Sequence, residues 1–206
     1  MSSSKIVEYS DSEDEEKIVD EIVHHEDSEE ILNDNLALSG KELKKLVEEN
    51  LFINCHPCEL RNFDIDRLET YSCNLALCPE AEGIYHWIVI TNHGNDIYTY
   101  MDTYGRSIPE IVNDYKIDLP ADLIAANSKI QNDYTVVCGY YCYLWLQHVV
   151  DTDFRSTSWN RFVVVNDNNN IFNTNVTLFN EYMCLKIFKD NVRQLSKRLQ
   201  HALKNV

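Results

Sequence analysis

The feature that most constrains the fold is an apolar stretch that begins directly after Cys138. Residues 139–150 read Gly-Tyr-Tyr-Cys-Tyr-Leu-Trp-Leu-Gln-His-Val-Val and hold no Asp, Glu, Lys or Arg. A helix of this composition is apolar around its whole circumference, so it belongs inside a core rather than on a surface. The sequence therefore predicts a fold built around one central helix with Cys138 at its N-terminal end.

Acidic residues separate a tail from a domain. Residues 1–38 hold 13 Asp or Glu and 2 Lys, which supplies −11 of the net charge of −16, and residues 39–206 carry −5. Few tail residues can bury apolar surface, so we expect a disordered segment over 1–38 and one folded domain over 39–206. The tail is a solubilising arm in the simplest interpretation. Docking to a basic partner and phosphorylation at Ser10, Ser12 or Ser28 remain open.

The N-terminus carries no signal for export. No run of 18 apolar residues occurs, and no basic segment precedes an apolar one near residue 1. We therefore expect no membrane span and no secretion, with the protein inside a cell or packaged in an assembled particle. In such a compartment the seven cysteines are expected to be free thiols, metal ligands or a nucleophile rather than a disulfide framework.

The remaining periodicities predict an α+β fold in which a small mixed or antiparallel sheet packs against the buried helix. A capping box at Ser39 and Glu42 opens a helix over about 40–50. The turn residues 92–96 separate two β-rich runs and predict a hairpin. The expected strands are 70–77, 85–91, 97–102 and 162–165, and the expected further helices are 108–115, 122–126 and about 178–204.

Four residues supply the parts of a cysteine hydrolase. Cys138 lies at a helix N-terminus, where unpaired N–H groups and the helix dipole favour a thiolate. His86 opens one apolar run, Asp102 closes the next, and the Gln131 amide stands seven residues before Cys138. Each alone has a plainer interpretation as a buried thiol, a structural histidine, a turn residue or a loop amide. Together they predict a nucleophile, a base, an orienting carboxylate and an oxyanion donor.

The order of these motifs resembles a known family. The motifs are Glu42-Leu43-Lys-Lys-Leu46-Val47, Tyr85-His86-Trp87, Tyr100-Met-Asp102-Thr-Tyr-Gly105-Arg-Ser107, and Gln131 followed by Cys138-Gly139. In this set and order the chain is similar to the adenovirus endopeptidase (adenain) family of cysteine proteases over about residues 39–150. It departs from that family at Asp102, where adenain has Glu, and at Val137, where adenain has a small residue.

The resemblance implies a role for each residue. Cys138 would attack a peptide carbonyl, His86 would pair with the thiolate and then protonate the leaving amine, and Asp102 would orient the imidazole. The Gln131 amide and the Cys138 N–H would form the oxyanion hole. It further implies a viral endopeptidase that cleaves capsid and core precursors after small residues during virion maturation, in the virion and the infected-cell interior, without a cofactor or metal.

Partners other than protein substrates follow less directly. The family resemblance leaves a peptide activator open. Nucleic acid binding is weakly supported, because residues 39–206 remain acidic and basic side chains gather only towards the C-terminus, at Lys186, Lys189, Arg193, Lys197, Arg198 and Lys204.

Two alternative functions remain open. Deconjugases of SUMO and ubiquitin-like proteins share the same plan, but they usually have Asp before the nucleophile and Gln six residues ahead of it. The second alternative is a non-enzymatic zinc-binding interaction module. It rests on a C-x2-C…C-x4-C series formed by Cys55, Cys58, Cys73 and Cys78, whose spacing is near that of structural zinc sites.

Overall fold

The computed structural model describes residues 36–81, 84–119, 123–127, 129–132, 135–155, 157, 164–165, 170–171, 178–192 and 195–204. The expected disorder of the tail over residues 1–35 therefore lies outside the described residues. The same is true of residues 162–163, with which one expected strand begins.

The described strands form one five-stranded mixed sheet and one small two-stranded sheet. In the large sheet the spatial order follows the sequence, with parallel outer pairs β1/β2 and β4/β5 and antiparallel inner pairs β2/β3 and β3/β4. The architecture is α+β with a mixed sheet, as expected from the sequence. The strands are β1 (Cys55–Glu59), β2 (Cys73–Ala81), β3 (Ile84–Asn92), β4 (Tyr98–Asp102) and β5 (Ile124–Asn127), with β6 (Val164–Val165) and β7 (Asn170–Ile171) forming the small pair.

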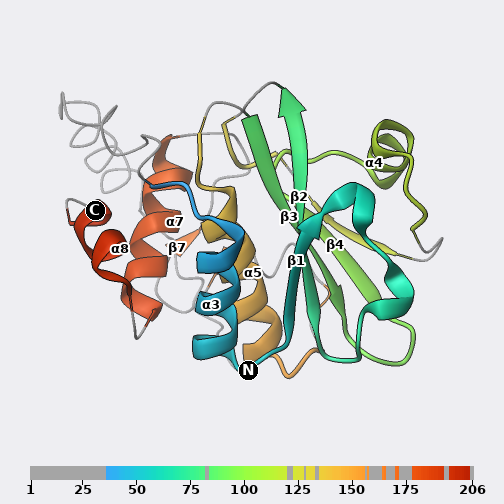
Figure 1. Ribbon diagram of the computed structural model, residues 1–206. Helices are drawn as coiled ribbons and strands as arrows, with labels where there is room; N and C mark the ends of the chain where they lie inside the picture. The colour runs from blue at the N-terminus through green and yellow to red at the C-terminus, as the bar shows by residue number, and fades with distance from the viewer. Residues whose placement is uncertain are drawn as a thin grey trace, which may run out of the picture.

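Helices cover both faces of the large sheet. In Figure 1 the helices α3, α5, α7 and α8 gather on one side of it, whereas α4 lies at the opposite side. The central helix α5 contacts β3, α3 and α7, and every residue from Cys138 to Leu146 is buried. The predicted central helix is confirmed. The helices are α3 (Gly40–Leu51), α4 (Ile108–Tyr115), α5 (Cys138–Asp151), α7 (Leu178–Asn191) and α8 (Lys197–Ala202), with short 3-10 turns at Leu60–Asn62 and Ile65–Arg67.

Strand alternation divides the apolar residues into two cores. Trp87 and Val89 point into the larger core around α5, and Ile88 and Ile90 point into the smaller core that Ile111 of α4 covers. The chain thus buries both faces of β3, which explains why its apolar run shows little alternation.

Local signals in the sequence fix several elements as expected. Ser39 and Glu42 form the predicted capping box, and a second one at Ser107 and Glu110 opens α4. The hairpin between β3 and β4 is confirmed, and Gly94, Asn95 and Asp96 take the left-handed backbone conformations that such turns require.

Three expectations differ from the structure. Residues 122–126 were expected to be helical, but Ile124–Asn127 forms β5. Parallel pairing with β4 outweighs the helix propensity of Ala125 and Ala126. The strand β1 was missed because it contains Pro57, which an edge strand tolerates. The helix expected over about 178–204 is divided into α7 and α8, and the Ser196 side chain caps the second helix.

The packed chain begins earlier than Ser39. Leu36 and Leu38 are buried in the larger core, and their carbonyl groups accept hydrogen bonds from the Tyr140 hydroxyl (2.7 Å) and the Trp87 indole (2.9 Å). Residues 36–38, which the charge pattern assigned to the tail, therefore contribute to the fold.

Candidate active site

The candidate nucleophile stands at the N-terminal end of α5. Val137 occupies the capping position without a side-chain hydrogen bond, so no side chain at that position takes up the first N–H groups of the helix. The Cys138 residue is only 4% exposed. On the next turn the Cys142 thiol lies 3.4 Å from the Trp87 carbonyl oxygen, which places the start of α5 against β3.

The candidate base and carboxylate come from β3 and β4. His86 Nε2 and Asp102 Oδ1 are 2.7 Å apart, and both side chains are fully buried. The ladder between these strands pairs residues 89–92 with residues 98–101, so His86 and Asp102 lie beyond its end. The two side chains thus meet where the paired parts of β3 and β4 stop.

Asp102 accepts four hydrogen bonds. Its Oδ1 atom accepts from His86 and from the Tyr104 backbone N–H at 2.8 Å, and its Oδ2 atom accepts from the Tyr100 hydroxyl at 2.9 Å and Arg106 Nε at 2.8 Å. Burial raises the pKa of a carboxyl group, but the bonds and positive charges of His86 and Arg106 outweigh it and hold the pKa of Asp102 well below its usual range. Asp102 is therefore a fixed, ionised partner for His86.

The His86 imidazole is poised between Asp102 and Cys138. Burial lowers its pKa, whereas the hydrogen bond to Asp102 and the interaction with Cys138 raise it, and the balance brings the pKa of His86 to about 9. Because Nε2 binds Asp102, the nitrogen that remains for Cys138 is Nδ1, for which the described residues supply no other hydrogen-bond partner. The Tyr104 ring stacks on the imidazole with centroids 3.7 Å apart and fixes its plane.

Gln131 lies in the loop that leads into α5. Its Oε1 atom accepts a 2.6 Å hydrogen bond from the Thr103 hydroxyl, and its Nε2 atom donates to the Thr135 carbonyl at 2.9 Å. These bonds tie the loop to the residue after Asp102. Among the described hydrogen bonds of Gln131 none reaches Cys138, so its role as an oxyanion donor remains a prediction.

The four cysteines of the possible zinc site do not converge. Cys55 and Cys73 are register partners inside the larger core, whereas Cys78 lies in the smaller core on the other face of the sheet. The Cys58 thiol contacts the Asn74 amide oxygen at 3.3 Å. Within the described ranges no three His, Cys, Asp or Glu side chains are grouped as metal ligands would be.

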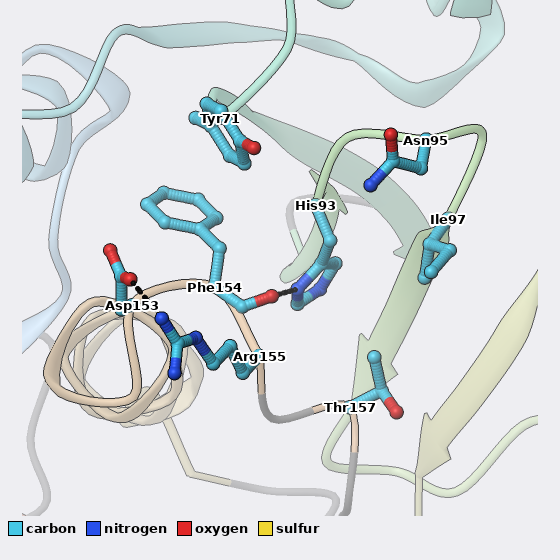
Figure 2. Close-up of a pocket in the computed structure, with 8 residues that line it drawn as sticks. All are labelled: Tyr71, His93, Asn95, Ile97, Asp153, Phe154, Arg155 and Thr157. Carbon is cyan, nitrogen blue, oxygen red and sulfur yellow. Dashed lines mark hydrogen bonds and ion pairs between the residues drawn. The ribbon is translucent and has the colours of Figure 1, made fainter.

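A pocket of about 660 Å³ lies at the other end of β3 and α5. Figure 2 shows Phe154 pointing into it between Tyr71 and His93, with the Phe154 carbonyl bound to the His93 ring. Both nitrogens of His93 are engaged, with the Phe154 carbonyl at 3.0 Å and the Thr99 hydroxyl at 2.8 Å. The pocket contains none of the four predicted catalytic residues.

Several residues of the site were not identified from the sequence. Arg106 and Tyr100 bind the second oxygen of Asp102, and the buried Glu181 of α7 binds the loop at Thr135 Oγ1, 2.8 Å away. Tyr100 could have been found, because it shares a strand face with Asp102 two residues on. Nothing in the sequence separates Glu181 from the other acidic residues.

Among the C-terminal basic residues, Arg198 is engaged within the fold. Arg198 binds Glu42 Oε1 at 2.7 Å and the Ala37 carbonyl at 3.2 Å, so this guanidinium holds the N-terminal segment.

Across the part of the chain that the structure describes, no helix has both the length and the apolar character needed to cross a membrane.

Two comparisons with known proteins find no match. Neither a scan against protein-family models nor a search of the curated proteins finds a match for this chain.

Proposed function

We propose that this chain is a cysteine endopeptidase in which Cys138, His86 and Asp102 form the catalytic triad. The observation that carries the proposal is the buried 2.7 Å bond between His86 Nε2 and Asp102 Oδ1, which leaves Nδ1 for the thiol at the head of α5. The resemblance to the adenovirus endopeptidase family extends the proposal to viral capsid and core precursors as substrates, and to the virion and infected cell as the site of action.

The proposed reaction uses this arrangement in two stages. The Cys138 sulfur attacks the peptide carbonyl, the C–N bond breaks, and His86 gives its Nδ1 proton to the leaving amine, which leaves a thioester on Cys138. Water then attacks the thioester while neutral His86 takes a proton from it. The carboxylic acid leaves and the ion pair is restored. Asp102 stays ionised throughout and stabilises the charged imidazole.

Burial keeps five of the other six thiols in the neutral form. Burial raises the pKa of Cys58, Cys73, Cys78, Cys142 and Cys184. Such groups hold little thiolate at neutral pH, and the thiolate is the form that reacts with alkylating agents. Selective reaction at Cys138 is thus a direct test of the proposed site.

The first experiment is alkylation with limiting iodoacetamide at neutral pH, read by peptide mass spectrometry at all seven cysteines. We expect Cys138 to be modified first, at least ~10-fold faster than the half-buried Cys58. His86→Gln should remove this advantage while leaving Cys58 unchanged. Uniform labelling in the wild-type protein would contradict the proposal.

Two further probes separate the alternatives. A peptide electrophile with Gly at its reactive end should label Cys138 if the chain is an endopeptidase. Labelling by a SUMO or ubiquitin electrophile alone would support a deconjugase. Stoichiometric zinc in the purified protein, together with no labelling of Cys138 by either probe, would support the non-enzymatic interaction module.

A further inference from the structure

Asp102 is held on its far side by a second charged pair. Arg106 Nε donates to Asp102 Oδ2 at 2.8 Å, and Arg106 Nη1 contacts Glu80 Oε1 at 2.5 Å. The charges along this line alternate from Glu80 through Arg106 and Asp102 to His86. Arg106 and Glu80 thus connect the triad to the surface, and the proposed reaction uses neither of them.

We propose that Arg106, held by Glu80, is a positioning residue that fixes the Asp102 carboxylate and sets the pH range over which Cys138 and His86 react. This inference rests on the proposed function. Arg106 reaches neither the thiol nor a substrate in the proposed reaction, and acts through Asp102.

The geometry favours a role specific to arginine. The guanidinium uses two different nitrogens to bridge two carboxylates, which a lysine ammonium cannot reproduce with the same fixed angles. The Arg106 side chain is 17% exposed and that of Glu80 is 25% exposed, so solvent screens this pair much less than an open surface pair. Tyr115 of α4 adds a contact from its hydroxyl to Glu80 Oε1 at 3.4 Å.

Four further titratable groups around this line stay neutral near pH 7. Burial raises the pKa of Cys78 on β2 and of Tyr115 on α4 to about 12. Burial also raises the pKa of Tyr100 on β4 and of Cys142 on α5. Tyr104, from the turn after β4, faces His86 with its ring. Among the described residues, the charged groups that act on His86 are therefore Asp102, Arg106 and, beyond it, Glu80, together with the Cys138 thiolate of the proposed ion pair.

The sign of each effect follows from Coulomb's law. A nearby cation disfavours proton binding at every neighbouring group, so removing Arg106 shifts the titration of the site to higher pH. Glu80 partly offsets Arg106, so removing its charge shifts the titration to lower pH. A purely structural role would lower stability in both variants without moving the titration in opposite directions.

The test measures the rate of Cys138 alkylation by iodoacetamide against pH in Arg106→Met, Arg106→Lys and Glu80→Gln. We expect Arg106→Met to move the profile up by roughly half to one pH unit and Glu80→Gln to move it down by a smaller amount. Arg106→Lys should keep the wild-type midpoints while its kcat for a cleavable peptide falls ~10-fold, because charge is retained and geometry is lost. Arg61→Met, which breaks an exposed pair with Glu59, is the matched control.

Nitrogen chemical shifts of the His86 ring, titrated in the same variants, give a second readout that needs no substrate. Shifts in opposite directions for Arg106→Met and Glu80→Gln support the role of Arg106. Profiles that coincide with the wild type, or that move in the same direction, overturn it. If Arg106→Met does not fold, Arg106→Lys and Glu80→Gln still decide the question. A wild-type Cys138 no more reactive than Cys58 would instead refute the proposed function.

Discussion

Two buried histidines, His86 in β3 and His93 directly after the end of β3, differ in the groups that their ring nitrogens contact. His86 gives Nε2 to the Asp102 carboxylate, whereas His93, seven residues on, gives Nε2 to the Thr99 hydroxyl and Nδ1 to the Phe154 carbonyl. Burial lowers the pKa of His93, while at His86 the carboxylate and Cys138 outweigh burial and raise it. The charge of the partner, rather than burial, separates the two.

The free nitrogen is the second difference. In the part of the chain that the structure describes, His86 Nδ1 has no other hydrogen-bond partner and is available to Cys138, whereas both ring nitrogens of His93 bind groups at the opposite end of the fold. A histidine whose two nitrogens bind neutral groups is locked in one tautomer and holds its neighbours together. The comparison thus contrasts the proposed base near the start of β3 with a histidine that packs the fold directly after the end of β3.

The strongest way to break this comparison is to replace each histidine with glutamine. His86→Gln should lower kcat/KM for a peptide substrate by ~10⁴-fold or more, because both the ion pair and the proton donor are lost. His93→Gln should leave the rate within a factor of about 3 and lower the free energy of unfolding by about 1–3 kcal/mol, because buried groups lose a partner. Peptide turnover and urea unfolding measure the two effects, and a large loss of turnover in His93→Gln would contradict the division.

Gln131→Glu sharpens the comparison at the catalytic end. The change places a carboxylate where an amide donor is predicted to meet the developing oxyanion. We expect kcat to fall ~10²–10³-fold with little change in substrate affinity, since the interaction matters most in the transition state. Alkylation of Cys138 should persist, because His86 and Asp102 are intact.

Gln131 also supports its loop, so its variant needs a stability control. The amide donates to the Thr135 carbonyl, and a carboxylate there would repel that oxygen. Unfolding of Gln131→Glu should be measured beside Gln147→Glu, which changes a half-buried amide on α5 that donates to Asp151. Turnover near the wild-type rate in Gln131→Glu would show that another group supplies the oxyanion contact, with Asn132 or a backbone N–H the next candidates.

His86 and His93 should also have opposite effects on the pH dependence of the free energy of unfolding. The pKa of His86 is raised to about 9 from 6.5 in the unfolded chain. Its contribution to the free energy of unfolding is therefore fully present below pH 6.5 and is lost as the pH rises through about 9. The pKa of His93 is lowered, so its contribution is present above 6.5 and is lost as the pH falls through its folded value.

Urea unfolding between pH 4.5 and 9.5 tests this expectation. His86→Gln should flatten the alkaline side of the profile by up to about 3 kcal/mol, and His93→Gln should flatten the acid side by less. If the acid side changes in His86→Gln and the alkaline side in His93→Gln, the assignment of charge states is wrong.

The sequence predicts the parts of this molecule that depend on local pattern. The capping box at Ser39, the hairpin around Gly94 and the central helix after Cys138 follow from turn chemistry and composition, and the structure has each of them. The strand β5 could not be predicted, since Ala125 and Ala126 join a sheet only because β4 lies beside them. Long-range pairing of that kind leaves no local signal.

The candidate site likewise has residues that the sequence predicts and others that it does not. His86 and Asp102 stand out because each lies at the end of an apolar run, and the structure joins them directly. Arg106 was overlooked because its importance comes from bridging two carboxylates that lie 22 positions apart in the chain, at 80 and 102. A contact between a turn and a neighbouring strand end is a property of the folded chain alone.

The point at which the ladder between β3 and β4 ends affects local opening of the sheet. Past Val89 and Met101 the two strands are joined by side chains, among which the His86 and Asp102 pair is buried and charged. Local separation of β3 and β4 at this end must break the pair between His86 and Asp102. The strength of this pair depends on the protonation of His86. The free energy of this local opening and the pKa of His86, the proposed base, therefore both depend on the contact between His86 and Asp102. Amide exchange at the start of β3 should accelerate as the pH rises through about 9, beyond the rise of intrinsic exchange.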